Sequence, residues 1–240
     1  MPFTASHPAI ILPLLLTPRY FSLTGLVIGS MAPDFEYFLR MKPQAVHGHT
    51  VAGLFYFDLP LALLLTFLFH NVVRNALIEN LPIFFKSRFI NAWKFDWNIY
   101  FKQKWLIVLC SIIIGSASHL FWDGFTHKTG FFISHNLELL QTVSIGGVNF
   151  PYYNILQHIS TLVGAIVIMV TIFNMPRFDV AIDSIWKYWT IVCVTTVIVV
   201  LIRILSGTSL QQYGILVVST ISGFLLSLVT TKFFIKSNGR

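Results

Sequence analysis

The residues best suited to chemistry in this 240-residue sequence form a short motif at the end of an apolar segment. The motif Ser-His-Leu-Phe-Trp-Asp-Gly-Phe-Thr-His covers residues 118–127. On a helix, His119 and Asp123 share a face, and His127 follows one turn later if the helix continues past Gly124. Stacked imidazole and carboxylate groups are typical ligands of a divalent metal. Taken alone, the spacing fits equally well a neutral histidine that is hydrogen-bonded to an aspartate at a membrane boundary.

A second group of candidate ligands flanks the segment 33–50. Asp34 ends an N-terminal apolar stretch, and His47 and His49 precede the next one, with no pattern that selects between the two histidines. His158 lies about one turn inside a later apolar segment, next to Gln157. If these segment ends lie on one side of a membrane, four histidines and two carboxylates converge there, His119 and Asp123 included.

Asp58 lies about two turns inside an apolar segment. A carboxylate in such a place is costly and is therefore a functional candidate. It could orient a liganding histidine through the second ring nitrogen, or serve, as Asp34 could, as a general base. The alternative is a protonated carboxylic acid that is bonded to neighbouring hydroxyl groups.

The elements that must position these residues are membrane-spanning helices. Hydrophobic residues make up 55% of the chain and charged residues 10%, far outside the range of soluble proteins. About 20 apolar residues cross a hydrocarbon core of roughly 30 Å, and five segments reach that length, near 51–72, 105–122, 153–174, 188–205 and 212–235. We therefore expect an all-α polytopic transmembrane bundle that forms a single integral membrane domain over residues 1–240.

The first apolar stretch, 9–32, is interrupted near its middle by Pro13, Pro18 and Arg19. An arginine in mid-membrane costs about 2.5–3.5 kcal/mol on insertion scales, and the prolines break a regular helix. We expect a broken or re-entrant element there. A re-entrant path would return His7 to the side on which Asp34 lies.

Lysine and arginine are distributed unevenly between the connecting segments. Eleven lie in 73–104, 175–187 and the C-terminal end, against three in 33–50, 123–152 and 206–211. By the positive-inside rule the rich segments and the C-terminus are cytoplasmic, which places the candidate ligands at the outer face. The net charge of +7 is then a property of these segments, and we expect no nucleic-acid partner.

One basic segment carries a regular aromatic pattern. Aromatic side chains recur every four residues at Phe85, Phe89, Trp93, Trp97 and Phe101, and lysines follow an adjacent face at Lys86, Lys94 and Lys102. This pattern predicts an amphipathic helix in the headgroup plane, attracted to anionic lipid. The alternative is a helix that packs against the bundle.

The order of several motifs resembles an uncharacterised bacterial integral membrane family, the domain of unknown function 4184. The matching motifs are Pro-Phe-Thr-x-Ser-His-Pro at 2–8, Gly-Ser-Met-Ala-Pro-Asp at 29–34, His-Thr at 49–50, Phe-Asp-Leu-Pro at 57–60 and the His-to-His motif at 119–127. The resemblance covers roughly residues 1–175, and the two additional spans in 188–235 contribute only hydrophobicity. It implies a protein of the bacterial cytoplasmic (inner) membrane.

That family is itself similar to membrane-bound metal-dependent hydrolases, and the order of its ligands is distantly similar to that of zinc-dependent phospholipases C. The resemblance implies six metal ligands, with Asp123 a candidate bridge: His7, Asp34, His49, His119, Asp123 and His127. His47, Gln157 and His158 are candidates for contacts with these ligands or with substrate. The phospholipases also have a final His-x3-Glu pair, which this sequence lacks.

The function expected from these observations is metal-dependent hydrolysis of an ester or phosphoester at the outer face of the membrane. Zinc is the metal that histidine and aspartate ligands favour, and a lipid or lipid-linked substrate could reach the site from the surrounding membrane lipids. The alternative is a non-enzymatic membrane protein, either an ion or metal transporter or a factor with a structural metal site.

Overall fold

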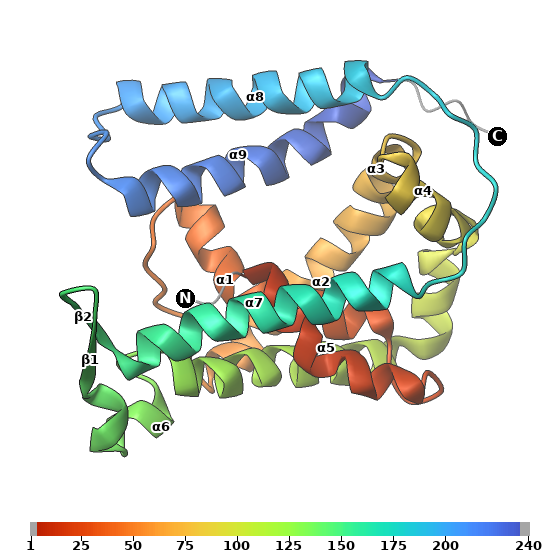
Figure 1. Ribbon diagram of the computed structural model, residues 1–240. Helices are drawn as coiled ribbons and strands as arrows, with labels where there is room; N and C mark the ends of the chain where they lie inside the picture. The colour runs from red at the N-terminus through yellow and green to blue at the C-terminus, as the bar shows by residue number, and fades with distance from the viewer. Residues whose placement is uncertain (1–3, 236–240) are drawn as a thin grey trace. The chain divides into compact units, whose positions relative to one another are not determined.

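The computed structural model describes residues 4–235, except for the side chains of Leu137 and Ile145. The regular secondary structure of the described residues is helical apart from one short hairpin (Figure 1). The helices are η1 (Thr4–Leu16), α1 (Leu23–Arg40), η2 (Leu54–Asp58), α2 (Leu59–Leu68), η3 (Phe69–Val73), α3 (Arg74–Glu79), α4 (Ile83–Phe89), η4 (Ile90–Lys94), α5 (Trp97–Thr126), α6 (Phe131–Ser134), η5 (Leu137–Leu140), α7 (Tyr152–Phe173), α8 (Trp186–Leu205) and α9 (Tyr213–Phe234).

Five helical segments are long and apolar enough to cross a membrane, which confirms the predicted fold class. They are Leu54–Glu79, Trp97–Ser134, Tyr152–Phe173, Trp186–Leu205 and Tyr213–Phe234. The first two are longer than the predicted spans, because η2, α2, η3 and α3 form one continuous helix and α5 begins well before residue 105. Most apolar side chains of α7 and α8 are exposed, as expected for helices that face lipid.

The chain divides into two compact units that interleave along the sequence. Unit 1 comprises Met1–Asp34, His47–Leu63 and Lys104–Asn174. Unit 2 comprises Phe35–Val46, Leu64–Gln103 and Met175–Arg240. The boundary inside α5 coincides with a kink at Lys104, whose backbone is not helical (φ −130°, ψ 25°).

The N-terminal apolar stretch is broken, as predicted. The 3-10 helix η1 ends at Leu16 and α1 begins at Leu23. The two arms meet again at their far ends, where the Thr4 hydroxyl donates a hydrogen bond to Asp34 Oδ2 at 2.5 Å. The element therefore turns back on itself within unit 1.

Small residues bring α1 and α5 into backbone contact in unit 1. Gly25 and Gly29 of α1 face Ser111 and Gly115 of α5, and neither Gly29 nor Gly115 has room for a Cβ atom. Such spacing of small residues is a common way to pack helices closely in membranes. This close approach sets the register between the helix that carries Asp34 and the helix that carries His119 and Asp123.

A hydroxyl group on α5 compensates for the proline inside α1. Pro33 has no N–H, so the carbonyl of Gly29, four residues earlier, lacks its helical partner. The Ser116 hydroxyl donates a hydrogen bond to this carbonyl at 3.0 Å. The same hydrogen bond links α1 to α5 about one turn before His119.

The predicted amphipathic helix over 85–101 is wrong as a single element. The segment forms α4, η4 and the start of α5, with extended backbone at Phe95 between the last two. Lys86 is buried and its Nζ donates to Asp183 Oδ2 and to the Ala181 carbonyl, both at 3.0 Å. Trp97 is 2% exposed and stacks on His70. Lys86 and Trp97, which the pattern predicts to contact lipid, therefore contact other residues of unit 2.

A short β-hairpin lies between α6 and α7, where no strand was predicted. Strands β1 (Thr142–Ile145) and β2 (Val148–Pro151) pair antiparallel, and Gly146 and Gly147 form the turn with φ of 61° and 82°. Two consecutive glycines with positive φ are typical of a tight hairpin turn. The Gly-Gly pair was therefore the available sequence signal.

In unit 2, α8 and α9 lie side by side as a hairpin (Figure 1). Tyr188 and Val192 of α8 and Leu228 of α9 are buried against Val73 and Ala76 of the helix Leu54–Glu79. The Trp189 indole donates a hydrogen bond to the Asn80 carbonyl at 2.7 Å. These contacts form the apolar core of this unit.

Candidate metal centre

Four histidines surround the carboxylate of Asp123 in unit 1. The nitrogen–oxygen distances are 3.7 Å from His7 Nε2, 3.4 Å from His49 Nε2, 3.3 Å from His119 Nε2 and 3.4 Å from His127 Nδ1. The helix α5 continues past Gly124 to Thr126, so it carries His119 and Asp123, and His127 directly follows its last residue with its N–H bonded to the Asp123 carbonyl. The other two histidines come from η1 and from the segment before η2.

Asp34 provides a second carboxylate to the same cluster. Its Oδ1 lies 3.4 Å from His49 Nε2 and 3.6 Å from His119 Nε2. Two sets of three ligand atoms, each set within 4.8 Å, can be formed: His7 with His119 and Asp123, and Asp34 with His49 and His119. These buried groups could hold a metal ion.

The spacing of the donor atoms fits metal ligands better than mutual hydrogen bonds. Charge-assisted hydrogen bonds between nitrogen and carboxylate oxygen are typically about 2.7–2.9 Å long. Two ligands that are each about 2.1 Å from one tetrahedral ion are about 3.4 Å apart. The distances within the cluster run from 3.3 to 3.7 Å.

Several of these buried atoms have no hydrogen-bond partner among the described residues. They are both ring nitrogens of His7, Asp34 Oδ1, His119 Nε2, both carboxylate oxygens of Asp123 and His127 Nε2. Buried polar groups without partners are rare, since each costs about 1–3 kcal/mol. Their concentration around one point is explained if an ion completes the site.

The tautomer of His119 is fixed by a backbone carbonyl. His119 Nδ1 lies 2.7 Å from the carbonyl oxygen of Ser30. A carbonyl can only accept, so Nδ1 must carry a proton, and Nε2 is the nitrogen that faces Asp34 and Asp123 and could ligate a cation there. Carbonyls that hold the second nitrogen of a histidine in this way are typical around metal ligands.

His49 is positioned by a tight turn that packs on Pro33 and Asp58. A Cβ atom on Gly48 would lie 2.8 Å from the Pro33 carbonyl oxygen and 3.0 Å from Asp58 Oδ1, so only glycine allows this approach. The Thr50 hydroxyl closes the turn by donating to the His47 carbonyl at 2.9 Å and accepting from Gly53 N–H at 2.9 Å. Asp58 is fully buried beneath this turn and ends the π-helical turn η2.

His7 is held by contacts of η1 with α7 and by ring stacking. The Ser6 hydroxyl donates to the Thr161 carbonyl at 3.1 Å, and Gly164 leaves space for the Ser6 side chain. The rings of His7 and His119 stack with centroids 3.8 Å apart. Burial, with the nearby His119 ring, lowers the pKa of His7 to about 3, so its imidazole is neutral and able to ligate a cation.

Asp34 and His49 lie outside the membrane-spanning helices, and their pKa values are shifted in opposite directions. Burial raises the pKa of the Asp34 carboxyl, but contacts with His119, His49 and Thr4 outweigh it and hold the pKa below its usual value. Burial lowers the pKa of His49, but the Asp123 and Asp34 carboxylates outweigh it and raise the pKa above its usual value. Without an ion, His49 therefore tends to hold a proton between the two carboxylates.

The structure brings together all six residues of the implied ligand set. Both metal-capable sets exclude His127, which touches Asp123 but is partly exposed. Of the two histidines near residue 48, His49 joins the cluster, whereas His47 Nδ1 lies 3.0 Å from the Tyr56 hydroxyl. His158 is exposed on α7. Gln157 precedes Thr161 by one turn of α7, and its carbonyl accepts from the Thr161 hydroxyl at 3.0 Å.

Three residues that support the cluster were missed from the sequence. Thr4 binds Asp34, Ser30 fixes His119 through its carbonyl, and Ser116 replaces the bond that Pro33 cannot make. Pro33 within a helical segment was an available signal for the last of these. Nothing in the residue types distinguished Thr4 or Ser30.

The family model with the description Domain of unknown function (DUF4184) matches residues 1–233, nearly the whole chain. No curated protein and no solved structure matches the chain.

Proposed function

The chain belongs to this family of unknown function, and we propose that it is a membrane-embedded, metal-dependent hydrolase that acts on an ester or phosphoester. The observation that carries the proposal is the set of buried histidine and aspartate atoms that face one another at 3.3–3.7 Å around Asp123. Histidine and aspartate together are the donors that catalytic zinc sites use, so zinc is the metal proposed.

A catalytic role is favoured over a purely structural one because the cluster is open on one side. The side chains of His49 and His127 are 22% and 25% exposed, whereas those of His7, His119 and Asp34 are buried. A catalytic metal site keeps a position open for water or substrate, whereas a structural site is closed. A divalent ion held here would polarise the scissile ester and make a water molecule nucleophilic near neutral pH.

The chain's own residues divide the remaining work. His119 and Asp123 supply ligand atoms from one helix, with the His119 tautomer held by Ser30. Asp34 is enclosed by Thr4, His49 and His119, which suits a ligand better than a general base. Asp58 supports the turn at Gly48 that carries His49, so we assign it a positioning role.

The proposed substrate is a lipid or a lipid-linked phosphate at the outer face of the membrane. The five apolar helices make the chain an integral membrane protein, and a substrate in the bilayer could reach a site that is built from membrane helices. The outer location rests on the uneven distribution of lysine and arginine.

Cysteine accessibility tests the orientation. In a variant with Cys110 and Cys193 replaced by alanine, Ser144→Cys should react in intact cells with a membrane-impermeant thiol reagent, whereas Ile83→Cys should react only after lysis. Both positions are exposed, so the difference reports the side of the membrane. The reverse pattern would put the centre at the cytoplasmic face.

Metal content tests the centre itself. The purified wild type should contain zinc or another divalent ion by inductively coupled plasma mass spectrometry, and His119→Ala should lose it. His158→Ala is the matched control, because it removes an exposed histidine from another helix. A wild type that holds metal but hydrolyses no lipid or lipid-linked phosphate would exclude the hydrolase and leave a structural or transport site.

A further inference from the structure

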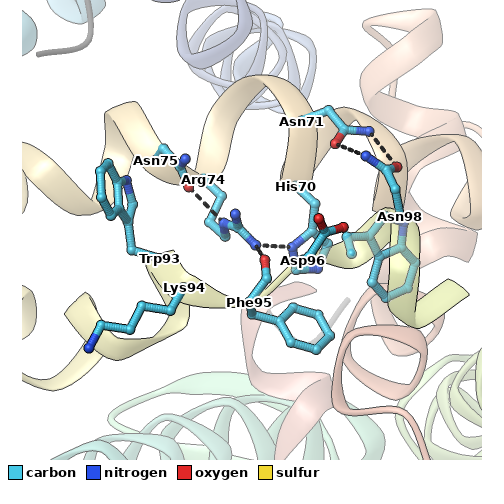
Figure 2. A pocket seen from close by; sticks show the side chains of 10 residues that line it. His70, Asn71, Arg74, Asn75, Trp93, Lys94, Phe95, Asp96 and Asn98 are labelled. Atoms are coloured by element: carbon cyan, nitrogen blue, oxygen red, sulfur yellow. Dashed lines mark hydrogen bonds between the residues drawn. The ribbon is translucent and has the colours of Figure 1, made fainter. Parts of the chain in front are cut away.

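A cavity of about 320 Å³ lies in unit 2, and it is built from residues other than those of the metal centre (Figure 2). Its walls come from two short segments, 70–75 and 93–98. Among the residues that line it, Arg74 is buried, and Lys94 and Asp96 are exposed. The indole N–H groups of Trp93 and Trp97, which also line it, have no hydrogen-bond partner among the described residues.

Arg74 is a buried cation whose hydrogen-bond partners are all neutral, and the nearby Asp96 carboxylate favours its positive charge without reaching ion-pair distance. Its residue is 7% exposed, and its nitrogens contact Asn75 Oδ1 at 2.8 Å, His70 Nδ1 at 2.9 Å and the Phe95 carbonyl at 2.6 Å (Figure 2). Within residues 4–235, no carboxylate forms an ion pair with it. A buried charge is costly unless it is paired, so the cavity favours an anion at this guanidinium.

The position of the cavity indicates where that anion comes from. Arg74 lies near the end of the span Leu54–Glu79, and Trp97 and Asn98 begin the next span, Trp97–Ser134. The ends of two consecutive spans lie at the level of the lipid headgroups, where tryptophan side chains also concentrate. Basic pockets between transmembrane helices at this level bind anionic headgroups.

We propose that this cavity binds the phosphate group of an anionic phospholipid, with Arg74 as the principal ligand. The guanidinium makes its known bonds through Nε and Nη1, which leaves Nη2 for a phosphate oxygen. Arginine suits phosphate because its planar donors match the oxygen geometry. Lys94, exposed at the rim, adds a second positive charge, and Asp96 opposes binding through its negative charge.

Lipid retention by the purified full-length protein in neutral detergent tests the proposal. Native mass spectrometry should show preferential retention of phosphatidylglycerol over phosphatidylcholine. Lys94→Ala should reduce retention of phosphatidylglycerol about fivefold, the effect of one basic residue near a charged headgroup. Lys102→Ala is the matched control, because it removes an exposed lysine that does not line the cavity, and it should retain the lipid.

Two further variants separate the ligand from a role of Arg74 in folding alone. Arg74→Gln should lose the preference for phosphatidylglycerol, and its melting temperature in the absence of lipid shows whether it folds. Asp96→Asn should increase retention several-fold, since it removes the opposing charge while asparagine still caps Ile99 N–H as Asp96 Oδ1 does at 2.9 Å.

Three results would overturn the proposal. Equal losses in Lys94→Ala and Lys102→Ala would show a general surface-charge effect. A lower melting temperature and lower lipid retention in Asp96→Asn would make Asp96 the counter-charge of Arg74. Stabilisation by inorganic phosphate without a preference for phosphatidylglycerol would exclude lipid as the source and identify a soluble phosphate compound.

Discussion

The two units both bury ionisable groups, but the groups have opposite chemical character. In unit 1, the carboxylates of Asp34 and Asp123 lie among imidazole rings, and His119 Nε2 and both oxygens of Asp123 have no hydrogen-bond partner among the described residues. In unit 2, Arg74 lies among neutral acceptors and tryptophan N–H donors. The first arrangement has unused electron-pair donors and the second has unused hydrogen-bond donors.

This difference shows what kind of ligand each region can take. Lone pairs at 3.3–3.7 Å from one another repel unless a proton or a metal cation lies between them. A buried guanidinium without a carboxylate is stabilised by an anion. Unit 1 thus contains a region suited to a cation, and unit 2 contains a region suited to a phosphate. Variants that change one region and leave the other intact test this comparison.

The largest effect is expected for Asp123→Asn, because Asp123 touches all four histidines of the cluster. Outer-shell partners of metal ligands contribute about 10–100-fold to affinity, so a carboxylate ligand should contribute at least as much. Metal content and any hydrolysis should fall, with helical content and phosphatidylglycerol retention unchanged. A sharp fall in melting temperature with no activity to lose would instead indicate a structural metal. Full metal occupancy would remove Asp123 from the site.

A smaller effect should distinguish His49 from His47, which the sequence pattern alone could not do. His49→Ala should lower metal affinity about 10-fold or more, because it removes a ligand atom that contacts both carboxylates. His47→Ala should leave metal content unchanged, and loss of its hydrogen bond with Tyr56 should cost about 0.5–1.5 kcal/mol of stability. Isothermal titration with zinc measures both affinities. Equal losses would place His47 in the site as well.

The close packing of α1 on α5 should affect metal binding only by setting the positions of the ligands. Gly29→Ala places a methyl group against the backbone of Ile112 and should cost about 1–3 kcal/mol of stability while moving Asp34 relative to His119. Gly214→Ala in unit 2 is the control, since its Cβ would meet only Pro43 Cγ at an ordinary 3.5 Å. Melting temperature and metal content should fall together in the first variant. Unchanged values would show that close helix contact is not needed.

The smallest effect is expected from pH. The raised pKa of His49 means that a proton occupies it below that pKa, and a metal ion must displace this proton. Affinity should therefore rise as pH increases through the His49 pKa, by at most about tenfold per pH unit for one proton. His7, with a pKa of about 3, adds no dependence near neutrality. The slope should become smaller in His49→Ala, and an unchanged slope there would assign the proton to another ligand.

The spans and the interrupted N-terminal element could be read from the sequence because they depend on local properties. Runs of apolar residues predict transmembrane helices whatever their neighbours are, and Pro13, Pro18 and Arg19 prevent a regular crossing wherever the segment packs. The shared face of His119 and Asp123 follows from helical geometry in the same way. The amphipathic pattern over 85–101 misled because Lys86 and Trp97 have partners far away in sequence, Asp183 and His70.

The sequence by itself determined a membrane helix bundle and the types of ligand that it carries. Only the tertiary structure decided that His49 rather than His47 joins Asp34, since this depends on how closely Gly48 approaches Pro33 and Asp58. The Ser30 carbonyl at His119 and the neutral hydrogen-bond partners of Arg74 were also decided there. The physical reason is that ligand distances and charge pairing depend on backbone approach between segments far apart in the chain, which residue types and local periodicity do not contain.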